Sequence, residues 1–290
     1  MTALLHQVLG GIANGAIYAS IALALVVIYK ATHHVNFAQG ELAMFSTYLG
    51  WTLVDAGLPY WAAFLLTLVL SFALGVFIER VIIRRVEKAP ILTVVIVFIG
   101  LLVVLNSLAG WIYGYTIKVF PSPFPTDAWY GGQYLSAHEV GMIAVFLTVL
   151  LCVFAFFRFT KVGLAMRASA ENPQSSRLVG ISVGWMLALG WGFAAVLGAT
   201  AGMMAAPIVF LEPNMMTGVM LYGFAAALLG GIDNPWGAPI GGFIVGILEN
   251  LAGAYVVGTQ LKLAVALLII VAVVTFKPSG LFGRTIVRRV

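Results

Sequence analysis

The side chains best able to do chemistry in this chain are the few polar ones that interrupt long apolar runs. Candidates for lining a polar path through these surroundings are Asn14, Tyr18, Asn36, Gln39, Glu41 and Glu249. Asn14 and Tyr18 are four residues apart and therefore share one helix face. Glu249 is the acid most clearly enclosed by apolar residues, and ionisable groups in such places are generally functional. A hydrogen bond between helices, or a buried protonated acid, would explain these residues equally well.

The segment NFAQGEL (36–42) differs most sharply in character from the apolar residues around it. It supplies two amides and the Glu41 carboxylate at or near a membrane boundary. Glu41 also follows closely after the loop KATHH (30–34), so an alternative places it at the cytoplasmic interface, paired with Lys30. We expect this segment to have a structural or gating role rather than direct contact with a transported molecule.

The largest internal polar segment is RFTKVGLAMRASAENPQSSRLVG (158–180). Asn172 is a good helix cap, Pro173 is favoured in a first turn and Gly180 is a typical stop, so a short helix is predicted from Pro173 to Val179. Such a helix could dock on a soluble partner, or the segment could be an ordinary loop whose basic residues only set orientation. The residues expected to belong to the docking segment are Arg167, Ala168, Glu171, Asn172, Pro173, Arg177 and Gly180.

Several other kinds of chemistry are not expected of this sequence. No lysine is preceded by glycine, so the phosphate-binding pattern GxxxxGK[ST] is absent and any ATP would be bound by another chain. The pair His33-His34 has no cysteine or carboxylate cluster at ligand spacing, so neither a metal nor another cofactor is expected. Glu212, in LEPNMMTG, is a candidate contact for an external binding protein or a gate residue, although an exposed acid without function is the simpler explanation.

The elements that must position these residues are apolar helices. Hydrophobic residues make up 62% of the 290 and charged residues only 9%, far below the roughly 25% of soluble domains. Apolar segments run over 9–29, 38–56, 60–80, 91–113, 138–157, 183–203, 218–232, 237–257 and 261–276. We therefore predict an all-α, polytopic membrane protein of about eight to nine transmembrane segments. It forms one domain over 1–290, with a cytoplasmic loop at about 158–182. The segment 218–232 is too short to cross unaided.

The basic residues predict the orientation. They gather at 80–88, 158–180 and 277–290, beside apolar segments, which is typical of cytoplasmic loops and does not indicate a nucleic-acid partner. The loops 114–137 and 204–217 then lie outside and the C-terminus lies in the cytoplasm. The N-terminus lies outside unless the second apolar segment fails to cross.

Glycines recur at a spacing of four residues, as in Gly11/Gly15 and Gly242/Gly246. This spacing lets helix backbones approach closely, so we expect these pairs to form packing seams. The face that carries Gly242 and Gly246 continues to Glu249.

Four motifs together resemble one known family. NFAQGEL (36–42), RASAENPQSSRLVGI (167–181), LLGGIDNPWGAPIGG (228–242) and KPSGLFG (277–283) are similar, in order and spacing, to the permease subunits of branched-chain amino acid ABC importers, in particular the LivH-type subunit. The resemblance covers nearly the whole chain and includes the ABC importer permease fold.

The resemblance implies partners as well as a function. These are a second related permease, two ATPase subunits that bind ATP and magnesium, and a periplasmic substrate-binding protein, all assembled at an inner membrane among its lipids. It favours the docking interpretation of 168–180, and it implies that this chain is a transport subunit and not an enzyme. The alternatives are a stand-alone secondary transporter or channel, or an ABC permease for urea, amides or sugars.

Overall fold

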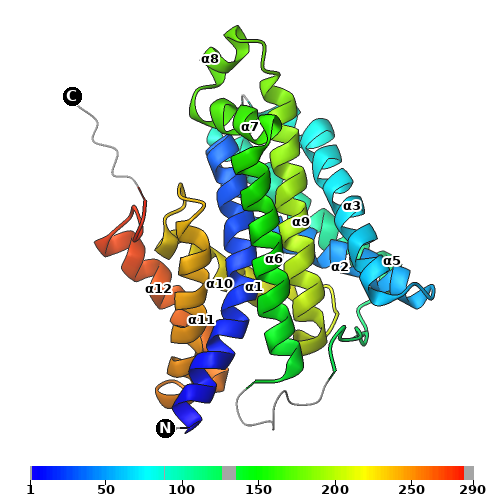
Figure 1. Ribbon diagram of the computed structural model, residues 1–290, viewed down its shortest axis with the longest axis vertical. Coiled ribbons are helices and arrows are strands. Elements are labelled where there is room, and N and C mark those ends of the chain that lie inside the picture. The colour runs from blue at the N-terminus through cyan, green and yellow to red at the C-terminus, as the bar shows by residue number, and fades with distance from the viewer. Residues whose placement is uncertain (1, 88, 126–134, 284–290) are drawn as a thin grey trace. The chain divides into compact units, whose positions relative to one another are not determined.

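The computed structural model describes residues 2–87, 89–125 and 135–283, and this part of the chain is almost entirely helical (Figure 1). The long helices are α1 (Thr2–Thr32), α2 (Gln39–Asp55), α3 (Tyr60–Ile78), α5 (Ile91–Tyr113), α6 (Ala137–Phe159), α9 (Val183–Val209), α10 (Met216–Gly230), α11 (Gly237–Tyr255) and α12 (Lys262–Phe276). The short ones are the π-helix η1 (Glu79–Ile83), α4 (Arg84–Val86), α7 (Lys161–Glu171), α8 (Pro173–Leu178) and the 3-10 helix η3 (Thr259–Leu261). The predicted all-α class is confirmed.

Each of the nine apolar segments predicted from the sequence lies on one long helix. Seven of the nine long helices among the described residues are long and apolar enough to cross a membrane, and α12 reaches this length only together with η3, as Thr259–Phe276. The other two are α2, with 17 residues, and α10, with 15. Helices of these lengths rise only about 25 Å and 22 Å, less than the roughly 30 Å of a hydrocarbon core. The short α10 was expected, and it was left open from the sequence whether the second apolar segment, which forms α2, crosses fully. These two helices account for the difference from the predicted eight to nine.

The chain divides into two compact units, and the boundaries fall within α1, between α5 and α6, within α6 and at the start of α10. One unit contains residues 1–26, 124–143 and 217–290, and the other contains residues 27–123 and 144–216. The expectation of a single domain over 1–290 stays a prediction.

In the first unit, α1 packs against α11 through the predicted glycine seams. A Cβ on Gly11 would lie 2.7 Å from the Cα of Ile247, and one on Gly15 would lie 2.9 Å from the Cα of Phe243. Gly246 in turn faces the backbone of Gly11 and Gly15. Only residues without a side chain permit this approach, so the seam brings α1 close to the helix that carries Glu249.

In the second unit, α9 is the central helix, and α2, α3 and α7 pack against it. Gln39, the first residue of α2, lies beside Ala194, which is near the middle of α9. Farther along, Gly198 faces Ala43 and Gly202 faces Thr47. The second helix therefore begins halfway along α9 and runs beside its second half, which explains why it is shorter than a full span.

Candidate functional site

The amides of NFAQGEL hold the start of α2 inside the second unit. Asn36 and Gln39 are fully buried. The Asn36 side chain accepts a hydrogen bond from the Ala38 amide at 3.0 Å and donates one to Oε1 of Gln39 at 3.3 Å. Gln39 in turn donates to the carbonyl of Ala194 at 2.9 Å. A helix end in an apolar interior needs partners for its free amides. These two polar residues, predicted as path or gating candidates, are occupied in joining α2 to α9.

Glu41 has a different partner from the one considered in the sequence analysis. Its buried carboxylate accepts a hydrogen bond from Nδ2 of Asn106 at 3.2 Å. The same nitrogen donates to the carbonyl of Pro213 at 3.0 Å and to Oδ1 of Asn214 at 3.2 Å. Glu41 therefore lies close to residues 213–214, in the loop expected from the sequence to lie outside, and its hydrogen-bond partner is Asn106 rather than Lys30. The side of the membrane on which Glu41 lies stays a prediction. The importance of Asn106 was not recognised from the sequence.

Glu249 lies in a polar cluster inside the first unit. Its side chain is 4% exposed, and its Oε1 forms an ion pair at 3.0 Å with Nζ of Lys262, at the start of α12. The Tyr18 hydroxyl donates to Oε2 at 3.4 Å, and the Tyr18 ring stacks on Tyr222 of α10 with centroids 4.7 Å apart. The path candidates Tyr18 and Glu249, named separately from the sequence, are thus in contact, whereas Asn14 is half-buried and is not among the residues of this cluster.

Lys262 extends this cluster to a second polar residue of α11. Its ammonium also donates to Oδ1 of Asn250 at 3.0 Å, and Asn250 donates to the Gln7 carbonyl of α1 at 2.8 Å. The cluster therefore joins α1, α11 and α12. Sequence reasoning missed Lys262, because a lysine at the start of an apolar segment is usually read as a marker of the membrane boundary.

The polar segment 158–182 is helical over most of its length. The short helix predicted after Asn172 is present as α8, and the Asn172 side chain accepts a hydrogen bond from the Ser175 amide at 2.9 Å. Gly180 has a positive φ of 83°, as a helix stop requires. Residues 161–171 of this segment form a further helix, α7, which was not predicted from the sequence. This helix is capped by Thr160, whose hydroxyl accepts from the Gly163 amide at 2.9 Å.

The predicted docking residues of this segment face outward. Arg167, Glu171, Asn172, Pro173, Arg177 and Gly180 are exposed, and Ala168 is partly exposed. The residues of α7 that are buried are Gly163, Met166 and Ser169, on the helix face that packs toward α9. The segment is therefore anchored by small and apolar residues while its charged residues remain accessible.

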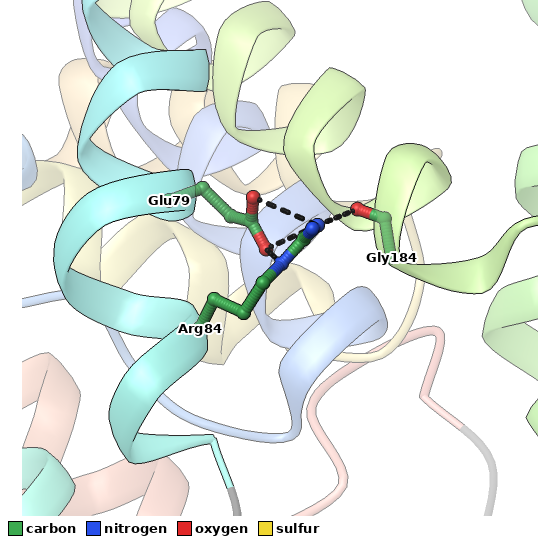
Figure 2. A network of polar contacts seen from close by, with 3 residues as sticks. All are labelled: Glu79, Arg84 and Gly184. Carbon is green, nitrogen blue, oxygen red and sulfur yellow. Dashed lines mark hydrogen bonds and ion pairs between the residues drawn. The ribbon is translucent and has the colours of Figure 1, made fainter.

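A second charged cluster lies where α3 continues into η1 and α4. Arg84 forms an ion pair with Glu79, with Nη2 3.2 Å from Oε1, and also donates to the carbonyl of Gly184 in the first turn of α9 (Figure 2). The guanidinium of Arg80 lies 3.4 Å from the centre of the Trp185 ring. From the sequence these arginines were interpreted only as topology markers in a loop, because the continuation of α3 as a π-helix leaves no simple sequence signal.

Glu212 is half-buried in the short connection after α9. The backbone of the preceding residue, Leu211, pairs with Lys118 through hydrogen bonds of 2.9 Å and 3.3 Å. The ammonium of Lys118 lies 4.5 Å from the centre of the Trp51 ring. The connection is thus fixed to the segment that follows α5. The expected role of Glu212 in contacting a binding protein stays a prediction.

Two of the four sequence motifs contact each other in the first unit. The Leu281 amide donates to the Leu229 carbonyl at 2.7 Å, and Nδ2 of Asn234 donates to the Phe282 carbonyl at 2.9 Å. Gly231 and Gly280 both have a positive φ, and a Cβ on Gly280 would lie 2.6 Å from the Cα of Gly231. The segments 228–242 and 277–283 therefore form one structure at the ends of α10 and α12.

Membrane-length helices, buried polar clusters and an outward-facing helical segment together define a multi-pass membrane permease. The model of one family, described as the permease component of the branched-chain amino acid transport system, matches residues 7–274. The chain belongs to this family.

Individual relatives are similar over almost their whole length. The high-affinity branched-chain amino acid transport system permease protein LivH of Escherichia coli K12 is 32% identical, over 99% of this chain and 97% of that protein. The corresponding protein BraD of Pseudomonas aeruginosa is 29% identical, over 99% and 98%. A probable branched-chain amino acid transport permease protein LivH of Methanocaldococcus jannaschii is 27% identical, over 94% and 91%.

Proposed function

We propose that this chain is the membrane permease subunit of an ATP-driven importer that moves branched-chain and other hydrophobic amino acids inward. The observation that carries the proposal is the similarity to LivH and BraD permease proteins along 99% of the chain. A path for aliphatic side chains is expected to be largely apolar with few charges. The low charge content of the helices suits such a path.

The proposed assembly contains a second related permease, two ATPase subunits that bind ATP and magnesium, and a periplasmic binding protein. The exposed face of α7 and α8 is the proposed docking site for an ATPase, because it is a charged, helical surface anchored on the central helix of its unit. We expect this assembly to lie in the inner membrane, with the C-terminus of this chain in the cytoplasm. Glu212 is the proposed contact for the binding protein.

The polar residues are proposed to act at different points of the path. Tyr18 and Glu249, with Asn14 on the same face of α1 as Tyr18, are the candidates for lining it. Asn36, Gln39 and Glu41 are proposed to hold α2 in place and to act as a gate. Gln39 bonds to α9, and Glu41 bonds to Asn106 of α5, which in turn contacts the loop beyond α9.

Reconstitution tests the proposed function. The chain is assembled in liposomes with the candidate permease, ATPase and binding-protein partners, and uptake of labelled leucine is measured with and without ATP. We expect uptake only when ATP and the binding protein are both present. Competition by unlabelled isoleucine and valine, but not by urea, acetamide or glucose, identifies the substrate class. Uptake that needs no ATP would instead identify a secondary transporter, and an intact assembly without leucine uptake would contradict the amino-acid substrate.

A further inference from the structure

The charged cluster at the end of α3 forms two separate connections to the first turn of α9. In the first, Arg84 binds both oxygens of the Glu79 carboxylate at 3.2 Å through Nη2, and the same nitrogen donates to the Gly184 carbonyl (Figure 2). The carboxylate is almost fully buried, with 2% of the Glu79 side chain exposed. One guanidinium thus joins a buried acid of η1 to the backbone of another helix.

The second connection is a cation–π contact. The Arg80 guanidinium lies over the ring of Trp185, and its Nε and Nη2 atoms are buried without a hydrogen-bond partner. The ring face is therefore the principal described contact of this cation. Gly184 and Trp185 are consecutive residues, so both arginines hold the same turn of α9. We call the set Glu79, Arg80, Arg84, Gly184 and Trp185 the α3–α9 clasp.

The turn held by the clasp is tightly connected to α8. Gly180 donates to the Arg177 carbonyl at 3.1 Å, Ile181 to Ser176 at 3.0 Å and Trp185 to Ser182 at 3.0 Å, all through backbone amides. One group of backbone hydrogen bonds thus closes the end of α8 up to Ile181, a second begins the first turn of α9 at Ser182, and the Ile181–Ser182 peptide joins them. Because so short a connection separates α8 from this turn, a displacement of α8 pulls on the turn, and the clasp joins the turn to α3.

We propose that the α3–α9 clasp transmits movement of the α7–α8 segment to α3, so that α3 and α9 move together when the partner ATPase closes. The proposal rests on the proposed function, in which an ATPase docks on α7 and α8. The clasp positions helices and does not touch the transported molecule. Coupling of this kind needs a physical connection between two elements that shift together, which the two arginines provide.

The test compares transport with ATP hydrolysis in the reconstituted complex. In Arg84→Gln the side chain loses its charge and its bidentate contact with Glu79. We expect the amount of leucine imported per ATP hydrolysed to fall about fivefold, while the complex still assembles and hydrolyses ATP. Arg84→Lys keeps the charge but not the planar fork and should recover part of the loss. Arg85→Gln removes an equal charge from the exposed neighbour and should change nothing.

Trp185 provides a second variant in case Arg84→Gln does not assemble. Its side chain is 51% exposed, so substitution should leave the fold intact. Trp185→Leu should lower leucine import per ATP, and Trp185→Phe, which keeps a ring face, should restore most of it. If uptake and ATP hydrolysis fall equally in these variants, so that leucine import per ATP is unchanged, the role of the clasp is overturned. If the unmodified complex shows no ATP-dependent uptake, the proposed function itself fails, and the two failures are thereby distinguished.

Discussion

Lys262 and Glu249 form an ion pair between α12 and α11, and the acid is the more deeply buried partner, with 4% of its side chain exposed against 26% for the lysine. Loss of the partner is therefore more costly for the acid than for the lysine. An unpaired Lys262 can still contact Asn250 and turn toward its exposed side, whereas an unpaired Glu249 keeps a charge in an apolar interior.

This asymmetry predicts an order of stabilities. Lys262→Met should destabilise the protein by about 3 kcal/mol, because it leaves the buried carboxylate with only the Tyr18 hydroxyl. Glu249→Gln should cost less, and the double variant Glu249→Gln/Lys262→Met should be more stable than Lys262→Met alone. Thermal unfolding in detergent, monitored by size-exclusion chromatography, measures the order of these stabilities. A double variant less stable than both single ones would show that the pair is not the main source of the effect.

The link between Glu41 and Asn106 predicts a second set of stabilities. Asn106→Leu removes the hydrogen bonds to Glu41, Pro213 and Asn214, and should cost about 1–3 kcal/mol because Glu41 stays buried. Adding Glu41→Gln should recover part of this loss, since a neutral amide is less costly to bury. The same unfolding assay applies. Equal stabilities of Asn106→Leu with and without Glu41→Gln would contradict the link.

The seam between α1 and α11 predicts a strong position effect for glycine. Gly246→Ala should destabilise the protein by about 1–3 kcal/mol, because its methyl group would meet the backbone of Gly15 at 2.6 Å. Gly100→Ala in α5 is the matched control, since no atom lies within 4 Å of a Cβ there. It should leave the midpoint of thermal unfolding unchanged or slightly raised. Similar midpoints for the two variants would argue against the close approach of α1 and α11.

The cap of α8 predicts a local effect on the proposed docking segment. Asn172→Ala removes the hydrogen bond to the Ser175 amide and should weaken α8 by about 1 kcal/mol. Hydrogen exchange of the amides in α8 should become about fivefold faster, corresponding to that energy, while exchange in α9 stays unchanged. Asn172→Asp keeps the acceptor and should restore protection, and Gln174→Ala serves as an exposed control. Unchanged exchange in Asn172→Ala would show that the cap does not hold the helix.

The same residues show what can be learned before the structure is known. All nine long helices of the described residues lie on apolar segments. Inside a bilayer no water is available to the backbone, so a crossing segment must satisfy its backbone hydrogen bonds internally, as a helix does. Both ends of α8 were equally predictable, since a cap at Asn172, a proline in the first turn and a stop at Gly180 act within a few residues. The spacing of the glycines alone predicted close contacts between helices, although it did not show which helix packs against which.

Other features depended on partners that lie far apart in the sequence. The amide that holds Glu41 comes from α5, and the acceptor of Gln39 lies 155 residues away in α9, so no local pattern identifies either. The helix α7 was missed because its apolar residues are few and its buried residues pack against α6 and α9, which are distinct elements of the fold. The contact of Arg84 with the Gly184 carbonyl likewise joins residues that are 100 positions apart.

The sequence by itself determined the all-helical membrane class, the nine apolar segments, the capped helix α8 and the family, because each depends on hydrophobicity, short-range hydrogen bonding or local motifs. Only the tertiary structure decided that Lys262 neutralises Glu249, that Asn106 holds Glu41 and that α2 begins halfway along α9. The physical reason is that the partner of a buried polar group is chosen by how helices pack. That choice depends on side chains from several distant segments at once.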